Sequence, residues 1–437
     1  MKKSSFLLGG ALLLVSLFTT SCKEVLGSLD NPVPSYLSLA TDSIGLSFGA
    51  SYKITPNSIN DKTAYTYQSM DERVVKVDGN GLVTAVGPGE TGVIVRQDAD
   101  AEGNYKFSQV ELKVTVPSPL TLEANANGKI KVLFNDFETE APICYTIAGA
   151  ETKAITTDTD IEVKKGDKVY FTSANEALAP DTWNFGVQIK PQMQAYIYGN
   201  LMSMISPDGN YIDNKTITKP FAFFGLFCDA WNIYTNWQDK IELPATTLTA
   251  SCYNQMFYNT GISEAPELPA TKMEPYCYQG MFMSCWNINN APKLPAMKLA
   301  DGCYGSMFAR CGSLWQAPEL PATELAPWCY QEMFWNCYNL NEGPVLPAKT
   351  LKQGCYDRMF AYCYSMTSLT CLATTLSGEG YDTEDWLFRA GYYPIQYNWG
   401  VTPTLKKAAS VTTWSKAADW ETNGWQVPAG WNIENAN

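Results

Sequence analysis

The sequence predicts a multidomain chain in which two N-terminal all-β sandwich domains precede a short α/β solenoid and a C-terminal cap. Short alternating segments separated by Gly, Asn and Pro run through residues 36–117 and 118–200, which predicts the two β domains. The same short motifs recur at a fixed interval through residues 201–378, which predicts the solenoid, a parallel strand ladder with short helices. In residues 379–437 the motifs stop, and this Trp-rich stretch is expected to form a cap and tail.

The composition excludes several classes of function. The chain has 437 residues, too many for one ordinary core, and a formal net charge of -13, which disfavours nucleic acid and anionic membrane surfaces as partners. The histidine count is 0, so Ser-His and Cys-His dyads and His-based zinc sites are excluded. Carboxylate-pair and lysine chemistry stay open, and no motif indicates a cofactor or a metal.

The N-terminus has the layout of an export signal. Residues 1–21 hold two lysines, an apolar run from Phe6 to Phe18, and small residues before Cys22. The apolar run is too short to anchor the chain across a membrane. The stretch SLFTTSCKE resembles a bacterial lipoprotein box, although the box is imperfect around Phe18.

That resemblance implies cleavage before Cys22 and a lipid on the Cys22 thiol. It implies an outer-membrane lipoprotein of a Gram-negative bacterium, exposed on the extracellular face and touching the membrane only through its lipid. Residues 22–35, which contain prolines and small polar residues, are then expected to be a tether. A plain secreted protein is the alternative.

Residues 36–117 are predicted to form the first β domain. Strand-like alternation covers residues 73–77, 82–86, 91–96 and 110–116, with a Gly- and Asn-containing turn at residues 78–81. The segment YTYQSMDERVVKVDGNGLVTAVGPGETGVIVRQ resembles a bacterial immunoglobulin-like domain of the intimin and invasin type. The resemblance implies a spacer or an adhesive module of a surface protein.

Residues 118–200 are predicted to form a second β-sandwich after the Pro-Ser-Pro boundary at residues 117–119. The segments 129–134, 161–163 and 168–172 alternate or are rich in β-forming residues. The sequence assigns this domain no function.

The repeats are the most informative part of the chain. An L-P-A triplet begins at Leu243, Leu268, Leu294, Leu320 and Leu346, and a Cys-Tyr pair begins at Cys252, Cys277, Cys303, Cys329 and Cys355. Both series advance by 25, 26, 26 and 26 residues, an interval typical of leucine-rich repeats. Degenerate copies at residues 222–233 and 372–376 are expected to cap the two ends.

Each repeat is predicted to contain a short helix and a very short strand. In one copy Tyr304, Met307, Phe308 and Cys311 fall at i, i+3, i+4 and i+7, the spacing of one helix face. The Pro-rich segment 318–321 suits a short strand with prolines at its ends. The recurring M-F-x-x-C motif with L-P resembles the BspA-like leucine-rich-repeat family. That resemblance implies a surface antigen or adhesin.

The repeats carry two columns of cysteines, one at the Cys-Tyr pairs and one eight residues later at Cys285, Cys311, Cys337 and Cys363. Buried thiols acting as small hydrophobic side chains are favoured. Disulfides between repeats and metal binding stay open as alternatives, although this spacing is not that of a zinc site.

A ligand-binding strip is predicted on one edge of the repeats. Aromatic residues follow the second cysteine position at Trp286, Tyr338 and Tyr364, and Trp231 is their counterpart in the first copy. Trp335 stands where other copies have Met or Ala, which predicts an exposed position. A row of exposed rings suits a sugar face or a protein hot spot. Packing of the rings between repeats is the alternative.

These observations predict a non-enzymatic cell-surface protein that adheres to host or bacterial protein or glycan ligands through its repeats. The alternative is a glycan-binding accessory lipoprotein of a polysaccharide-uptake system. An enzyme with a carboxylate pair is a third, weaker hypothesis, because the acidic residues near residue 384 are equally explained as solvated charges.

Overall fold

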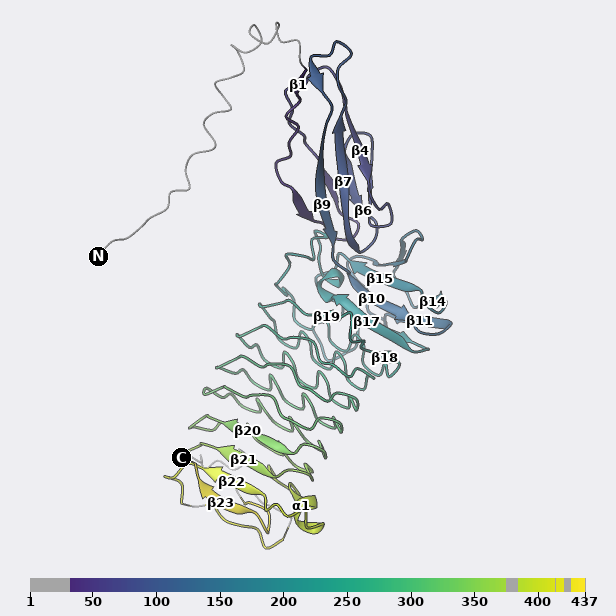
Figure 1. Cartoon of the computed structure of the whole chain (residues 1–437). Helices are drawn as coiled ribbons and strands as arrows, with labels where there is room; N and C mark the ends of the chain where they lie inside the picture. The colour runs from purple at the N-terminus through teal and green to yellow at the C-terminus, as the bar shows by residue number, and fades with distance from the viewer. Residues whose placement is uncertain (1–31, 375–383, 413, 420–425, 437) are drawn as a thin grey trace, which may run out of the picture. The chain divides into compact units, whose positions relative to one another are not determined.

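The computed structural model describes residues 32–374, 384–412, 414–419 and 426–436 (Figure 1). The expected signal segment and Cys22 lie outside the described residues. The described residues form two compact units; the first holds residues up to 44 with 51–84 and 90–114, and the second holds the rest. None of the described helices has the length and apolar character needed to cross a membrane.

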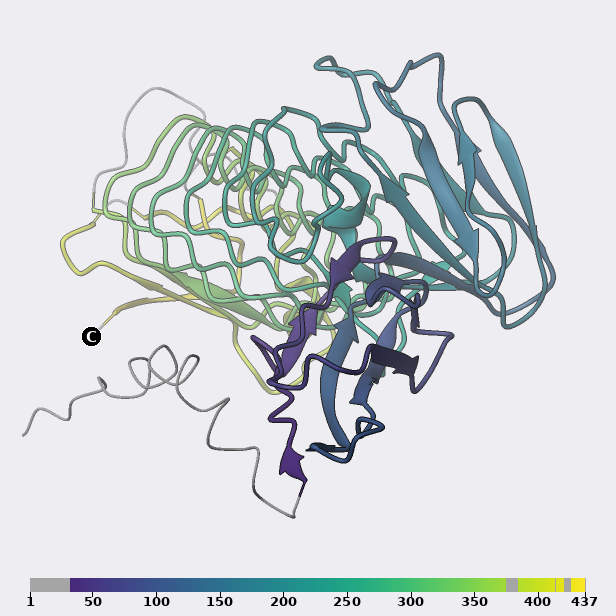
Figure 2. The same ribbon diagram turned by 90° about the horizontal axis from the view of Figure 1, so that it is seen from above.

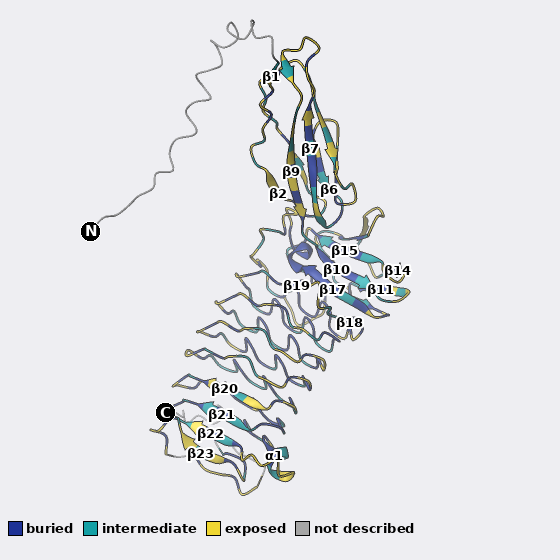
Figure 3. Cartoon of the chain, viewed as in Figure 1, coloured by how far each residue is buried: buried dark blue, intermediate teal, exposed yellow. Residues whose placement is uncertain are grey.

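The N-terminal part of the chain is all β. Its strands are β1 Val33–Pro34, β2 Ser43–Gly45, β3 Ser51–Lys53, β4 Tyr65–Ser69, β5 Val75–Val77, β6 Leu82–Ala85, β7 Gly89–Gln97, β8 Tyr105–Lys106 and β9 Ser108–Val116. One sheet has the order β2-β9-β7-β4, and another has the order β3-β6-β5. Alternate side chains of β7 and β9, among them Val95 and Val114, are buried (Figure 3). Their two-residue period is the pattern expected of half-buried strands.

The second unit begins with another set of strands. They are β10 Leu120–Ala124, β11 Gly128–Leu133, β12 Ile143–Ile147, β13 Lys153–Ile155, β14 Thr159–Val163, β15 Lys168–Ser173, β16 Gln188–Pro191 and β17 Ala195–Asn200. β17 pairs in parallel with β18 Ile233–Tyr234 and β19 Ile241–Glu242, which belong to the first repeat copies. We call residues 118–200, which contain β10 to β17, the β domain. The β domain and the repeats share one continuous hydrophobic core, and β17 covers the first edge of the repeats.

The repeats stack as coils, which lie as nested loops in Figure 2. We number the coils by their turn segments: coil 1 is 221–231, coil 2 is 251–261, coil 3 is 276–286, coil 4 is 302–312, coil 5 is 328–338 and coil 6 is 354–364. Within a turn segment every second backbone N–H group donates a hydrogen bond to a carbonyl of the next coil. For example, Tyr278 donates to the Cys303 carbonyl at 3.0 Å. The N–H groups between them close local turns, as where Met281 donates to the Tyr278 carbonyl at 3.2 Å.

The predicted short helices are therefore wrong, and with them the α/β leucine-rich-repeat solenoid. Each turn segment has a residue with positive φ at every fourth position, as at Tyr276, Gly280 and Ser284, which no α-helix contains. Each four-residue turn points two consecutive side chains inward, so the buried positions also fall at i, i+3, i+4 and i+7. The spacing of Tyr304, Met307, Phe308 and Cys311 thus fits turns as well as a helix. Among the described residues α-helix is confined to α1 Tyr392–Gln396, and a 3-10 turn, η2, spans Leu201–Met204.

The parallel ladder is also shorter than predicted. The strands β20 Glu342–Leu346, β21 Ser368–Cys371, β22 Thr404–Lys407 and β23 Asn432–Asn435 form a parallel sheet in that order. Earlier Pro-rich segments meet only in single bridges, such as Gln316 with Glu342, because proline has no N–H to donate. The sheet continues past residue 378, and the exposed residues of β20 and β23 are coloured yellow in Figure 3.

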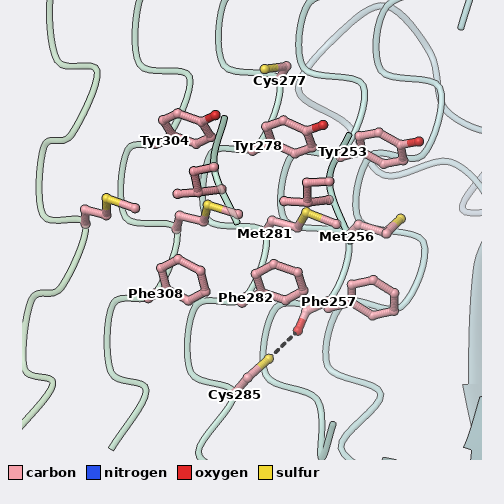
Figure 4. Close-up of a cluster of buried hydrophobic side chains, with 14 of the residues drawn as sticks. Tyr253, Met256, Phe257, Cys277, Tyr278, Met281, Phe282, Cys285, Tyr304 and Phe308 are labelled. Atoms are coloured by element: carbon pink, nitrogen blue, oxygen red, sulfur yellow. Dashed lines mark hydrogen bonds between the residues drawn. The ribbon is translucent and has the colours of Figure 1, made fainter. Parts of the chain in front are cut away.

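Two columns of stacked rings fill the interior of the coils (Figure 4). One column contains the tyrosines of the Cys-Tyr pairs, and ring centroids of Tyr278 and Tyr304 lie 5.9 Å apart with 4° between their planes. The other contains phenylalanines, where Phe282 and Phe308 are 5.6 Å apart. Coils 2 to 6 offer the same two rings at the same places, whereas coil 1 has Phe223 in the tyrosine column, so each coil added after coil 2 buries the same aromatic face.

The described cysteines form no disulfides, and those of the repeats are buried. In the second column each thiol caps a carbonyl of the coil before it, as where Cys285 donates to the Phe257 carbonyl at 2.9 Å and Cys337 to the Phe308 carbonyl at 3.0 Å. In coil 2 Thr260 takes this position, but its hydroxyl donates to a carbonyl of its own coil, that of Phe257, at 3.0 Å. The thiols therefore act as small packing groups with a weak donor.

Burial of these thiols predicts loss of stability in alkali. Burial raises the pKa of Cys285 to about 11 and of Cys252, Cys329 and Cys337 to about 12. The folded chain holds these protons more tightly than the unfolded chain, so their contribution is complete below about pH 9 and is lost as the pH rises toward 12. Urea midpoints should fall steadily across this window, and a midpoint constant from pH 8 to 11 would contradict the prediction.

Candidate ligand-binding face

The outward side chains of the turn segments form one face of the coils, here called the turn face. The predicted residues Trp231, Trp286, Tyr338 and Tyr364 all occupy the last position of their turn segments. Trp231 is 65% exposed and Trp286 is 46% exposed, whereas Tyr338 and Tyr364 are half-buried. The structure therefore places these four predicted side chains in one line along the stack.

Trp335 lies on the turn face but is half-buried, whereas the sequence predicted an exposed position. The Arg310 guanidinium of coil 4 covers its ring at 4.8 Å from the centroid. The Tyr362 ring of coil 6 contacts it edge-on at 5.9 Å. The small side chains at this position in coils 4 and 6, both alanine, leave the room that the indole occupies.

A second line of rings, which the sequence reasoning missed, runs along the other side of the turn face. It contains Tyr276 and Trp328, the first residues of coils 3 and 5, both half-buried. At coil 1 the corresponding Phe221 is buried beneath Trp183, whose centroid is 5.2 Å from the Phe221 ring and 5.9 Å from the Tyr276 ring. Trp183 comes from the β domain, is 59% exposed, and continues this line.

We call Trp183, Tyr276 and Trp328 the first row, and Trp231, Trp286 and Tyr338 the second row. Glycines in the neighbouring coils make room for these rings. A Cβ on Gly302 would overlap the Tyr276 ring, and a Cβ on Gly354 would overlap the Trp328 ring. In the second row the Tyr338 ring lies over Gly312 in the same way. The first-row rings Tyr276 and Trp328 thus lie against the backbone of the following coil, and Tyr338 lies against that of the preceding coil.

Charged groups of the turn face are concentrated in coils 5 and 6. Arg358 reaches Glu332 at 3.1 Å and Asp357 at 3.2 Å, and the hydrogen bond that it donates to Asp357 raises the pKa of Arg358. Gln331 also donates to Asp357 at 2.8 Å. Arg358 therefore offsets one of the two carboxylate charges that it contacts.

More aromatic side chains surround Tyr364 near α1. Its ring centroid is 5.1 Å from that of Tyr393, which in turn lies 6.4 Å from Trp399. Trp399 is 50% exposed, whereas Trp386 and Trp431 are fully buried. Trp420 and Trp425 lie outside the described residues. The described tryptophans after residue 378 therefore serve mainly to pack the end of the stack.

A groove of about 610 Å³ lies between the Pro-rich segments 316–323 and 342–347. Its lining is largely apolar and includes Met297, Pro318, Pro321, Pro344, Val345 and Pro347. The groove exists where the prolines keep neighbouring coils from completing a ladder. Its carboxylates are Glu319 and Glu342 at the exposed ends of the two segments.

The described residues contain no group of three or more cysteine, aspartate or glutamate side chains placed to hold a metal. Burial raises the pKa of the repeat thiols, such as Cys303 and Cys311, well above the usual value, so these thiols stay protonated and are poor nucleophiles.

In comparisons with known proteins, the chain matches no family model and no curated protein. The resemblances to a lipoprotein box, to an immunoglobulin-like domain and to a surface antigen therefore stay predictions.

Proposed function

We propose that this chain is a non-catalytic binding protein that attaches to an extracellular ligand through the turn face. The observation that carries the proposal is the gathering of two rows of half-exposed aromatic rings on one face of the stacked coils. Single exposed apolar side chains are common on protein surfaces, but rings repeated in line along a rigid scaffold are typical of binding surfaces.

The scaffold supports this role because it holds the rings in place. Each ring of the rows belongs to a turn segment, or rests on one, whose backbone is bonded to the next coil. A ligand therefore meets side chains that lose little freedom on binding, which reduces the entropic cost of association. Attachment of the chain to a cell surface through Cys22 stays a prediction from the sequence.

The second row provides the direct test. Trp231 and Trp286 are exposed, so replacing both with alanine should change the free energy of unfolding by less than about 1 kcal/mol. Ligand binding should weaken by at least tenfold, because exposed aromatic anchors contribute most at binding surfaces. The full-length protein and the variant are applied to arrays of matrix proteins, bacterial surface proteins and polysaccharides.

Trp237→Ala is the matched control, since Trp237 is 79% exposed and lies in the loop between β18 and β19, outside the turn face. This variant should bind as the unaltered protein does. If the double variant keeps full affinity for every ligand the array reveals, the turn face is not the binding surface.

A further inference from the structure

From coil 1 to coil 5 the two rows have a period of two coils. In coil 6 Gly354 keeps this period at the first position, whereas Tyr364 breaks it at the last. Coils 3 and 5 carry aromatic residues at both the first and the last positions of their turn segments, Tyr276 and Trp286 in one and Trp328 and Tyr338 in the other. Coils 2 and 4 carry Ser251 with Gly261 and Gly302 with Gly312 at the same positions. Coil 1 follows the aromatic pattern, with Trp183 over Phe221 in the first row and Trp231 in the second.

The hydrogen bonds follow the same alternation. Asn287 follows Trp286 and donates to the Gly261 carbonyl at 3.1 Å, and Asn339 follows Tyr338 and donates to the Gly312 carbonyl at 2.7 Å. Each asparagine is exposed and directly follows an aromatic residue of the second row in the sequence, and its amide oxygen can accept a hydrogen bond from a ligand. The binding unit of the turn face is therefore a pair of coils.

The two-coil period determines how far apart successive rings of a row lie along the stack. Tyr304 stacks 5.9 Å from Tyr278 and 5.9 Å from Tyr330, so residues two coils apart, such as Trp286 and Tyr338, are separated by about two such steps along the stack. The first row is closer at its beginning, where the Trp183 and Tyr276 centroids lie 5.9 Å apart. Extended chains of pyranose rings present every second sugar at a comparable separation, and a sugar's apolar face stacks well on an aromatic ring. A globular protein ligand would be expected to need a central cluster of anchors, not a regular series.

In coils 2 to 4 the turn face between the rows is almost uncharged, whereas coils 1 and 5 carry Asp229 and Glu332. Residues 252–260, 277–285 and 303–311 contain one charged side chain, Arg310, and its guanidinium lies over the Trp335 ring. Over the whole chain 17% of residues are charged, so this stretch is depleted. It offers amides and hydroxyls instead, such as Gln255, Gln279 and Ser306. Such groups bind hydroxyl-rich neutral ligands and give no ion pairs to an acidic or a basic polymer.

From these observations we propose that the ligand of the turn face is an extended neutral polysaccharide, which lies along the stack and places every second sugar on a ring of a row. The proposal rests on the proposed function, because it names the ligand class of the same face. It assigns Tyr276 and Trp328 to the binding surface together with the second row.

Affinity electrophoresis of the full-length protein tests the proposal. Gels contain hydroxyethyl cellulose, galactomannan or arabinoxylan as neutral polymers, and polygalacturonate as an acidic one. We expect at least one neutral polymer to retard the protein, at low and high salt alike, and polygalacturonate to retard it less. Oligosaccharides of the polymer that retards the protein should bind at least tenfold more tightly with six sugars than with two, because only the longer chains reach two rings.

Trp328→Ala should weaken this retardation at least tenfold, while Trp328→Tyr, which copies the ring type of coil 3, should restore most of it. Trp237→Ala serves as the control, and the circular dichroism of each variant shows that it is folded. Absence of retardation by all neutral polymers, or full retardation of folded Trp328→Ala, overturns the polysaccharide proposal. If instead a protein ligand is lost in the Trp231 and Trp286 double variant, the proposed function stands and the polysaccharide does not.

Discussion

Phe308→Ala should lower the free energy of unfolding by about 4 kcal/mol, the cost typical of truncating a buried phenylalanine. Phe308 is fully buried in coil 4 and stacks between Phe282 at 5.6 Å and Phe334 at 6.0 Å. Truncation removes both ring contacts and leaves a cavity that the hydrogen-bonded backbone of the neighbouring coils keeps open. Urea unfolding followed by tryptophan fluorescence measures the loss.

The position of Phe308 in the middle of the stack also predicts how broad the urea unfolding transition of Phe308→Ala should be. In a stack of coils each repeat contacts mainly its neighbours, so a defect in the middle uncouples the two halves. We expect a broader urea transition, or two transitions, where the unaltered protein shows one. Phe308→Leu, which refills most of the volume, should lose less than about half as much. A loss below about 1 kcal/mol for Phe308→Ala would show that the phenylalanine column does not hold the coils together.

The positions of the repeats and of their buried residues could be predicted from the sequence, whereas their backbone could not. Tyr304, Met307, Phe308 and Cys311 are buried as the spacing requires. The same spacing arises from a 3.6-residue helix and from turns of four residues that each point two side chains inward. What separates the two is where the N–H groups bond, and that depends on a coil 25 or 26 residues away. A local period cannot report such a partner.

The second row could be predicted because three of the four residues that follow the second cysteine are aromatic, namely Trp286, Tyr338 and Tyr364. The first row was missed because only two of the five residues that precede the Cys-Tyr pair are aromatic, Tyr276 and Trp328, with Ser or Gly in the other copies. Comparing Tyr276 with Trp328, two repeats apart, would have revealed it. Trp183 could not have been found this way, since it reaches the row from the β domain by tertiary packing.

Gly199→Ala should destabilise the protein by about 3 kcal/mol or more, because Gly199 sits at a close approach of three chain segments. Gly199 has a φ of 87° and ends β17 against β19, where its N–H donates to the Lys240 carbonyl at 2.9 Å. A Cβ at this position would overlap the Pro119 carbonyl, which the neighbouring bond from Asn200 to the Ser118 carbonyl at 2.9 Å holds in place. Since backbone on both sides is fixed, the methyl group must push the first coils away from the β domain.

Gly209→Ala separates this overlap from backbone strain. Gly209 has a φ of 73°, and a Cβ there meets nothing within 4 Å, so alanine should cost only about 1 kcal/mol. The difference between the two variants in urea unfolding then measures the close approach alone. Equal losses would mean that the junction yields without cost. In that case β17 would not be a fixed template for the coils, and the alignment of Trp183 with the rings of coils 3 and 5 would lose its structural basis.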